Sequence, residues 1–233
     1  MKDQYFGDIN DYRKYGLLRT LSDSGKLRVG VCWMLTAPDG RADGQFRNYL
    51  SEPMRYRSFD FQLFDALKPC LTDPSKRCVT LAETAKIIPN GIFHPTILTD
   101  NRGDRSTYFS DFASLSAECE LVFLDPDNGL EVSSVGKGHK DSCKYVYWDE
   151  LQQIYGAGKS LLVYQHFCRI KRDVFISNLA DRARKRLGAR EIITFRTPHV
   201  LFLLIPQQAH EETLRRQSRV VADVWSSQIK VGV

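Results

Sequence analysis

The chain has 233 residues, of which 42% are hydrophobic and 26% are charged, and its formal net charge is +5. This near-average composition excludes a disordered chain, and the length suits a single α/β domain over residues 1–233. The longest apolar run, Val200–Ile205, is far shorter than the roughly 20 residues that a membrane helix needs. Without an apolar signal segment or a C-x-x-C pair among the six cysteines, we expect a cytoplasmic protein with free thiols and no membrane partner.

Apolar spacing and turn residues predict alternating helices and strands along the chain. The first helix is expected over residues 11–22, capped by Asp8 or Asn10, and it is followed by a buried strand over 27–35. The other predicted helices cover residues 59–67, 80–88, 111–115, 149–155, 171–187 and 209–226. The other predicted strands cover residues 93–98, 120–124, 160–164, 191–195 and 200–205.

This alternation favours an α/β fold with a mostly parallel sheet and helices on both faces. Only residues 196–199 separate the last two strands, which is too short for a helical crossover, so this pair is predicted to be antiparallel. A mostly parallel, Rossmann-like sheet that ends in an antiparallel strand pair resembles the plan of the S-adenosylmethionine-dependent methyltransferases.

Ligands of open α/β sheets bind beyond the carboxyl ends of the strands. Three predicted strands end in polar segments, at residues 36–44, at 125–129 and at Gln165-His166. His166 suits a general acid or base, although a histidine that caps the edge of the core is the commoner case. The segment 125–129 contains Asp, Pro, Asn and Gly, which also suit a plain turn that stops a strand.

The order of the motifs resembles the bacterial large-subunit ribosomal RNA adenine-N6 methyltransferase family. Those proteins begin with an aromatic arm and a short helix that holds an Asn or Asp and a Lys, and here residues 5–15 read YFGDINDYRKY. Their catalytic Asp-Pro-Pro-Tyr follows the fourth strand, where this chain has Asp125-Pro126-Asp127-Asn128.

The resemblance implies that Asp125 and the carbonyl of Pro126 accept the two N–H bonds of an exocyclic adenine amine. It also implies S-adenosylmethionine as cofactor. Its expected binding residues are Lys14 and, in the loop after the first strand, Thr36, Asp39, Gly40 and Gly44. Asn128 takes the place of the aromatic residue that stacks on a flipped base in the family.

Two alternative functions stay open. Asp125, Asp127 and Glu131, together with Asp8 or Asp11, offer the hard oxygen ligands that Mg²⁺ prefers, which predicts a nuclease or another hydrolase. A non-catalytic nucleic-acid-binding protein on a methyltransferase-like scaffold is the second alternative.

The whole net positive charge of the chain lies in one segment. Residues 169–190 contain eight basic and two acidic residues, so this segment carries +6 while the rest of the chain sums to −1. A local basic patch favours a nucleic-acid partner, with Tyr5 as a stacking surface and Arg182, Lys185 and Arg186 as phosphate contacts. The alternative is a solvated helix whose basic end complements the helix dipole.

Overall fold

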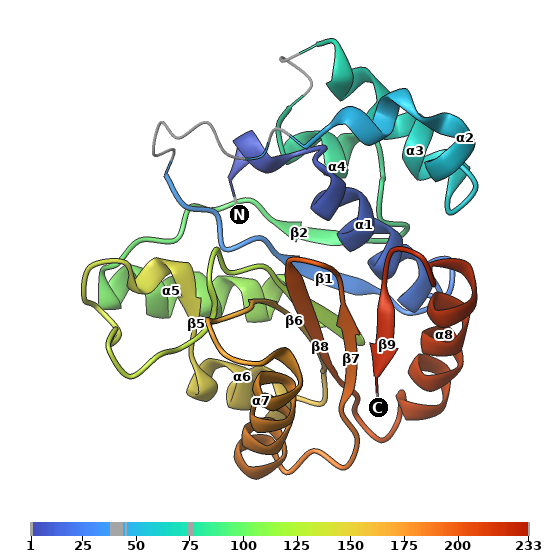
Figure 1. Cartoon of the computed structure of the whole chain (residues 1–233). Helices are drawn as coiled ribbons and strands as arrows, with labels where there is room; N and C mark the ends of the chain where they lie inside the picture. The colour runs from blue at the N-terminus through green and yellow to red at the C-terminus, as the bar shows by residue number, and fades with distance from the viewer. Residues whose placement is uncertain (1, 38–43, 45, 74–76, 233) are drawn as a thin grey trace.

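A seven-stranded mixed sheet forms the centre of the α/β fold in the computed structural model, which describes residues 2–37, 44, 46–73 and 77–232 (Figure 1). The strand order is β2-β1-β3-β6-β8-β7-β9. These strands are β1 Val29–Cys32, β2 Ile92–His94, β3 Leu121–Leu124, β6 Ser160–His166, β7 Ile193–Arg196, β8 Val200–Ile205 and β9 Lys230–Gly232. A separate two-stranded sheet joins β4 (Gly129–Leu130) to β5 (Tyr145–Val146).

The strand directions confirm the expected mixed sheet. Strands β2, β1, β3 and β6 are parallel, whereas β8 is antiparallel to both of its neighbours, β6 and β7. Strand β9 adds an antiparallel edge to β7. Because β7 therefore runs parallel to β6, the carboxyl ends of β1, β3, β6 and β7 all meet at one edge of the sheet.

Helices cover both faces of the sheet and create two apolar layers. Helices α1, α3, α4 and α8 lie on one face, and α5, α6 and α7 lie on the other. Both faces of β3 are thus covered, which explains why its four residues are all apolar and fully buried. The helices are α1 Ile9–Leu21, α2 Pro53–Tyr56, α3 Phe61–Leu67, α4 Thr80–Thr84, α5 Arg102–Leu115, α6 Trp148–Gly156, α7 Arg172–Leu187 and α8 Glu211–Val224.

Helix α1 is held at its start by a cap and along its length by close packing. The side chain of Asp8 accepts hydrogen bonds from the backbone N–H groups of Asn10 and Asp11, so Asp8 is the cap. At Gly16 the indole of Trp225 approaches so closely that a Cβ atom would lie 2.1 Å from it. These contacts fix α1 between α8 and the sheet.

Several element boundaries differ from the sequence prediction. Helix α5 begins at Arg102 instead of 111, because Asn101 caps a polar first turn that lacks an apolar stripe. Helix α4 ends at Thr84, and Lys86 has a positive φ of 48°, which stops the predicted helix over 80–88. Strands β4, β5 and β9 and the short helix α2 were not predicted. Among the described residues, no helix is long and apolar enough to cross a membrane.

Candidate active site

The carboxyl edge of the sheet brings together polar side chains from distant parts of the chain. Asp125 directly follows β3, Thr36 lies four residues beyond β1, and His166 ends β6. The first half of α1 lies over this edge and contributes Asp11 and Lys14. The sequence analysis predicted one site with Lys14, Thr36, Asp125, Asp127 and His166, and hydrogen bonds join Lys14 to Asp125 and Thr36 to Asp127.

Lys14 is the central charged residue of this site. Its side chain is buried, and its Nζ atom lies 2.9 Å from Asp11 Oδ1 and 2.7 Å from Asp125 Oδ2. The ammonium also lies 5.3 Å from the centre of the Tyr164 ring. Burial lowers the pKa of Lys14, but Asp11 and Asp125 raise it by more, so the side chain stays charged.

Asp11 is a buried carboxyl group with an unusual protonation equilibrium. Burial raises its pKa from 3.8 to about 7, against the lowering effect of Lys14. The charges of Asp8 and Asp125 add to the increase. Its Oδ2 atom accepts hydrogen bonds from the Gly7 backbone and the Tyr15 hydroxyl. The site therefore holds a group that titrates near neutral pH.

Asp127 joins the loop after β1 to the turn after β3. The Thr36 hydroxyl donates a hydrogen bond of 2.7 Å to Asp127 Oδ2, and Lys2 Nζ lies 3.8 Å from the same oxygen. Both contacts connect segments about 90 residues or more apart. Lys2 was not predicted, because a lysine in a chain-terminal arm has no local sequence signal.

The turn at residues 125–129 is held in place by Gln165. Its side-chain oxygen accepts from the Leu130 backbone N–H at 2.8 Å, and its amide nitrogen donates to the Asn128 carbonyl at 3.3 Å. Gly129 has a φ of +117°, and a Cβ atom there would lie 2.5 Å from the Gln165 amide. The backbone of Asn128 is thus hydrogen-bonded on both sides: its carbonyl accepts from Gln165, and its N–H donates to Lys144 O.

His166 lies near the Asp125 and Asp127 carboxylates, and its side chain is exposed to solvent. Its Nε2 atom lies 3.4 Å from the Tyr164 hydroxyl. Desolvation lowers the pKa of His166, while the charges of Asp125 and Asp127 act in the opposite direction. A mostly neutral imidazole with solvent access is suited to proton transfer at neutral pH.

The residues proposed as metal ligands are not arranged around a common point. Within the described part of the chain, no group of three or more His, Cys, Asp or Glu side chains is placed to hold a metal ion. Asp125 is instead bound by the Lys14 ammonium. Glu131 follows β4, where its backbone N–H donates to Val146 O.

The residues expected to bind the cofactor are only partly described. Asp39 and Gly40 lie outside the described residues. Gly44 has a φ of +81°, and a Cβ atom there would lie 2.5 Å from Gln4 O and 2.8 Å from the half-buried Tyr5 ring. Its lack of a side chain is therefore explained by packing against the N-terminal arm.

Lys14 and Asp127 carry the charges that would pair with the amino-acid end of S-adenosylmethionine. Lys14 would match its carboxylate, and Asp127 would match its ammonium group. Thr36 adds a hydroxyl beside Asp127. The match is one of charge and hydrogen-bonding capacity at the edge of the sheet where α/β proteins bind nucleotides.

Two of the basic residues predicted to bind nucleic acid, Lys185 and Arg186, lie toward the other edge of the sheet. Helix α7 runs back from the end of β6 to the start of β7, so its last turn, with Lys185 and Arg186, is remote from Asp125. Arg182 packs over the Trp148 ring, with 5.4 Å from its guanidinium carbon to the ring centre.

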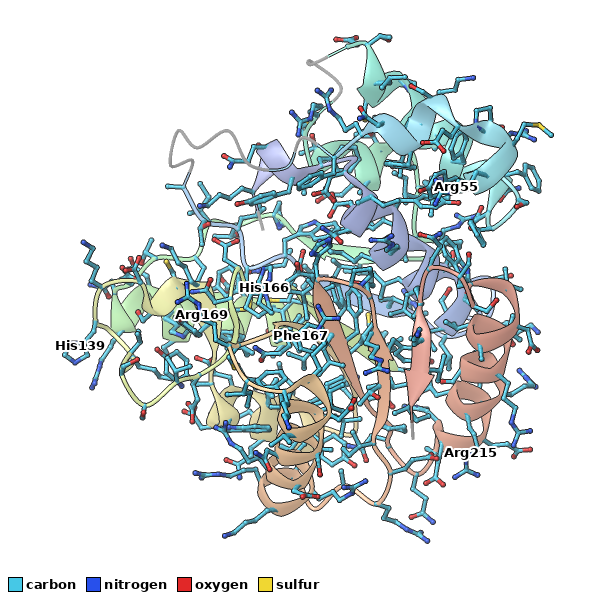
Figure 2. All side chains as sticks on the ribbon, in the orientation of Figure 1. Arg55, His139, His166, Phe167, Arg169 and Arg215 are labelled. Carbon is cyan, nitrogen blue, oxygen red and sulfur yellow. The ribbon has the colours of Figure 1, made fainter. Side chains whose placement is uncertain are left out.

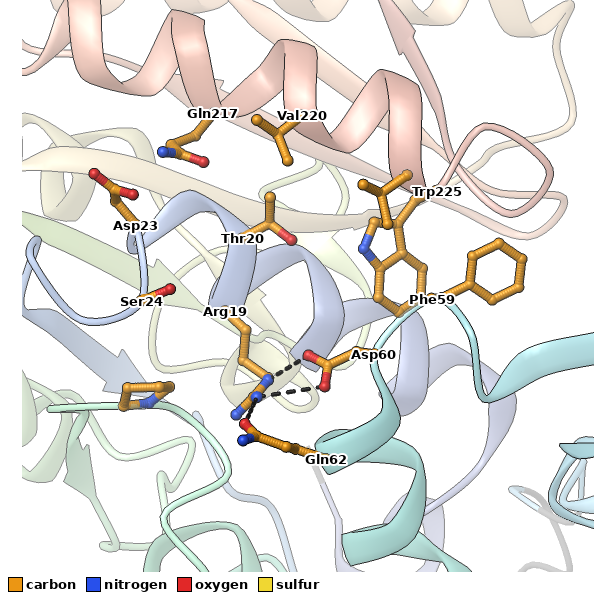
Figure 3. Close-up of a pocket in the computed structure, with 12 residues that line it drawn as sticks. Arg19, Thr20, Asp23, Ser24, Phe59, Asp60, Gln62, Gln217, Val220 and Trp225 are labelled. Carbon is orange, nitrogen blue, oxygen red and sulfur yellow. Dashed lines mark hydrogen bonds and ion pairs between the residues drawn. The ribbon is translucent and has the colours of Figure 1, made fainter.

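A separate hollow of about 460 Å³ lies between the C-terminal end of α1, the segment before α3, and α8 (Figure 3). Its wall includes the Arg19–Asp60 ion pair, with 2.5 Å between Nε and Oδ2, and the stacked rings of Phe59 and Trp225. None of the predicted site residues lines this hollow.

In comparisons with known proteins, no protein-family model, curated protein or solved structure matches this chain. The resemblance to the ribosomal RNA methyltransferases therefore rests on the sequence motifs alone.

Proposed function

We propose that the protein transfers a methyl group from S-adenosylmethionine to an exocyclic amine of a nucleic-acid base. The observation that carries this proposal is the contact between Lys14 and Asp125. The two residues are 111 positions apart, and the family resemblance had marked both of their segments as functional. Their meeting at the carboxyl edge of a Rossmann-like sheet is what a shared site requires.

The chemistry of the step explains the need for Asp125. The lone pair of an exocyclic amine is delocalised into the base, so the nitrogen is a weak nucleophile. Asp125 and the Pro126 carbonyl accept its N–H bonds and localise the lone pair for attack. When bound, S-adenosylmethionine would supply the methyl group, and the bond from that methyl group to sulfur would break as the bond to the amine nitrogen forms. The amine proton leaves through Asp125 or the solvent-exposed His166.

Lys14 has two roles in this proposal. Its ammonium holds the Asp125 carboxylate in position and offers a charged partner to the carboxylate of the cofactor. This ammonium already neutralises the Asp125 carboxylate, which would weaken the attraction of Asp125 for Mg²⁺. The contact therefore favours methyl transfer over the magnesium-dependent hydrolase.

Two measurements test the proposed function. Calorimetry with S-adenosylmethionine should show binding to the wild type and at least tenfold weaker binding to Lys14→Gln. Tritium transfer from labelled S-adenosylmethionine to single-stranded RNA or DNA should follow the same order. Lys26→Gln, at an exposed side chain, is the matched control and should behave as the wild type. A wild type that does not bind S-adenosylmethionine would overturn the proposal.

A further inference from the structure

A basic surface borders the candidate active site at the end of β6. It consists of residues 166–171, the first turn of α7, and residues 196–199 at the end of β7 and in the β7–β8 turn. Because β6 and β7 are parallel, these segments share the carboxyl edge with Asp125. We refer to this surface as the basic rim. Its basic side chains are Arg169, Lys171, Arg172, Arg196, His166 and His199.

The basic rim carries a surplus of positive charge. Asp173 is the acidic residue of the α7 first turn, and its Oδ1 atom lies 3.0 Å from Arg196 Nη1. Arg169 and Lys171 are exposed, and within the described part of the chain neither has a carboxylate partner. Figure 2 shows His166, Phe167 and Arg169 close together beside the sheet edge.

Internal contacts hold the basic rim in a defined shape. Arg172 donates a hydrogen bond of 2.6 Å to the Pro198 carbonyl, which joins the α7 start to the β7–β8 turn. The Arg172 guanidinium carbon lies 5.0 Å from the centre of the Phe167 ring, which in turn packs edge-on against Phe175. A surface that is already ordered loses less entropy when it binds a partner.

The position of Asp125 limits the kind of partner. Asp125 is buried, so a base inside a duplex cannot bring its amine to the carboxylate without leaving the stack. A single strand has no pairing to break. Exposed, unpaired guanidinium and ammonium groups next to such a site complement a phosphodiester backbone.

We propose that the basic rim binds the backbone of a single-stranded nucleic acid while one of its bases enters the site at Asp125. This inference rests on the proposed function for the destination of the base, but the backbone contact can be measured alone. In this proposal the basic rim, and not the C-terminal end of α7, is the phosphate-binding surface. The sixteen residues of α7 span about 24 Å, which separates that end from Asp125.

Fluorescence anisotropy with a labelled twelve-nucleotide RNA, and with its DNA counterpart, tests this inference across salt concentrations. The test variant is Arg169→Gln with Lys171→Gln. The matched control is Lys185→Gln with Arg186→Gln, which removes the same charge from exposed positions of the other end of α7. The slope of log affinity against log salt should become shallower by about 1.4 in the test variant, at about 0.7 per lost phosphate contact. The control should keep the wild-type slope.

Each contrary result has a definite meaning. The proposal that the basic rim binds the backbone is wrong if the salt slope of the test variant is unchanged or if the control changes equally. It is also wrong if the wild type binds neither the RNA nor the DNA. Equal affinity for poly-glutamate shows an acidic-protein surface and overturns it too. If methyl transfer persists while the salt slope of the test variant is unchanged, the backbone-binding role of the basic rim is wrong but the proposed function stands. Rim-dependent binding by a protein that does not bind S-adenosylmethionine defeats only the proposed function.

Discussion

Lys14 shows how one side chain determines the electrostatics of the candidate active site. A buried ammonium is costly unless carboxylates neutralise it, and Asp11 and Asp125 do so at 2.9 and 2.7 Å. Two carboxylates around one ammonium leave a surplus of negative charge. The raised pKa of Asp11 follows from that surplus and from burial.

Carboxyl-carbon NMR should detect the titration of Asp11 directly. We expect its midpoint near pH 7 in the folded protein, compared with about 4 for an unfolded chain. Because the folded-state pKa is the higher one, Asp11 lowers the stability as the pH rises from about 4 to 7. In Asp125→Asn the midpoint should fall, since the Asp125 charge raises it. A wild-type midpoint near 4 would contradict the buried position of Asp11.

Replacing Asp125 and Asp127 in turn separates the methyltransferase from the metal-dependent enzyme. In a methyltransferase, Asp125→Asn should reduce turnover by about 100-fold or more and leave the affinity for S-adenosylmethionine largely intact, because Asp125 acts on the amine. In a metal enzyme, Asp125→Asn and Asp127→Asn should both weaken Mg²⁺ binding. Calorimetric titration of each variant with both ligands distinguishes the two patterns. If the wild type binds neither ligand, the non-catalytic binding protein is the function that remains.

At the scale of elements, the packing of α1 against α8 sets the position of Lys14. The approach of Trp225 to Gly16 leaves no room for even a methyl group. A substitution there must move α1, α8 or both, and it would shift the first half of α1 relative to Asp125.

Gly16→Ala should therefore destabilise the protein by about 1–3 kcal/mol, because overpacking outweighs the higher helix propensity of alanine. The matched control is Gly156→Ala in the last turn of α6, where a Cβ atom meets nothing within 4 Å. The control should gain about 0.5–1 kcal/mol. Urea unfolding of both variants measures these changes, and a stabilised Gly16→Ala would show that the contact with Trp225 is loose.

The success of the sequence prediction varied with the strength of the local signal. Strands β3, β6 and β8 are apolar runs between turn residues, so they were predicted within two residues of their observed ends. Strand β9 has three residues and pairs with β7 through tertiary contacts, which no local pattern indicates. In the site, Asp125 and Lys14 were found from motifs. The roles of Gln165 and Lys2 depend on contacts between distant segments.

At the scale of the whole molecule, chain topology separates two basic surfaces that are continuous in sequence. The basic segment over residues 169–190 begins at the carboxyl edge of the sheet and ends at the amino edge, because α7 runs back along β6. The sequence composition shows that residues 169–190 are basic, but it does not show which of them lie at the carboxyl edge of the sheet. Within the described basic segment, the loop at the start of α7 is the part that shares the carboxyl edge with Asp125, which is why the basic rim and the predicted patch differ.

The two apolar layers share a single sheet, and this predicts one cooperative unfolding transition. Trp33 and Trp225 are buried in the layer of α1 and α8, whereas Trp148 is buried in the layer of α5, α6 and α7. Strands β1, β3, β6 and β8 contribute side chains to both layers. Neither layer can lose its helices without exposing one face of these strands.

Tryptophan fluorescence can follow each layer separately. Trp148→Phe leaves the α1 layer as the fluorescent reporter, and the double variant Trp33→Phe and Trp225→Phe leaves the α6 layer. In each variant the fluorescence midpoint in urea should equal the midpoint of far-UV circular dichroism, as two-state unfolding requires. Each variant serves as its own reference, so a loss of stability from the substitution does not affect the comparison. Separate midpoints would divide the chain into two folding units, and residues 1–233 would no longer count as one domain.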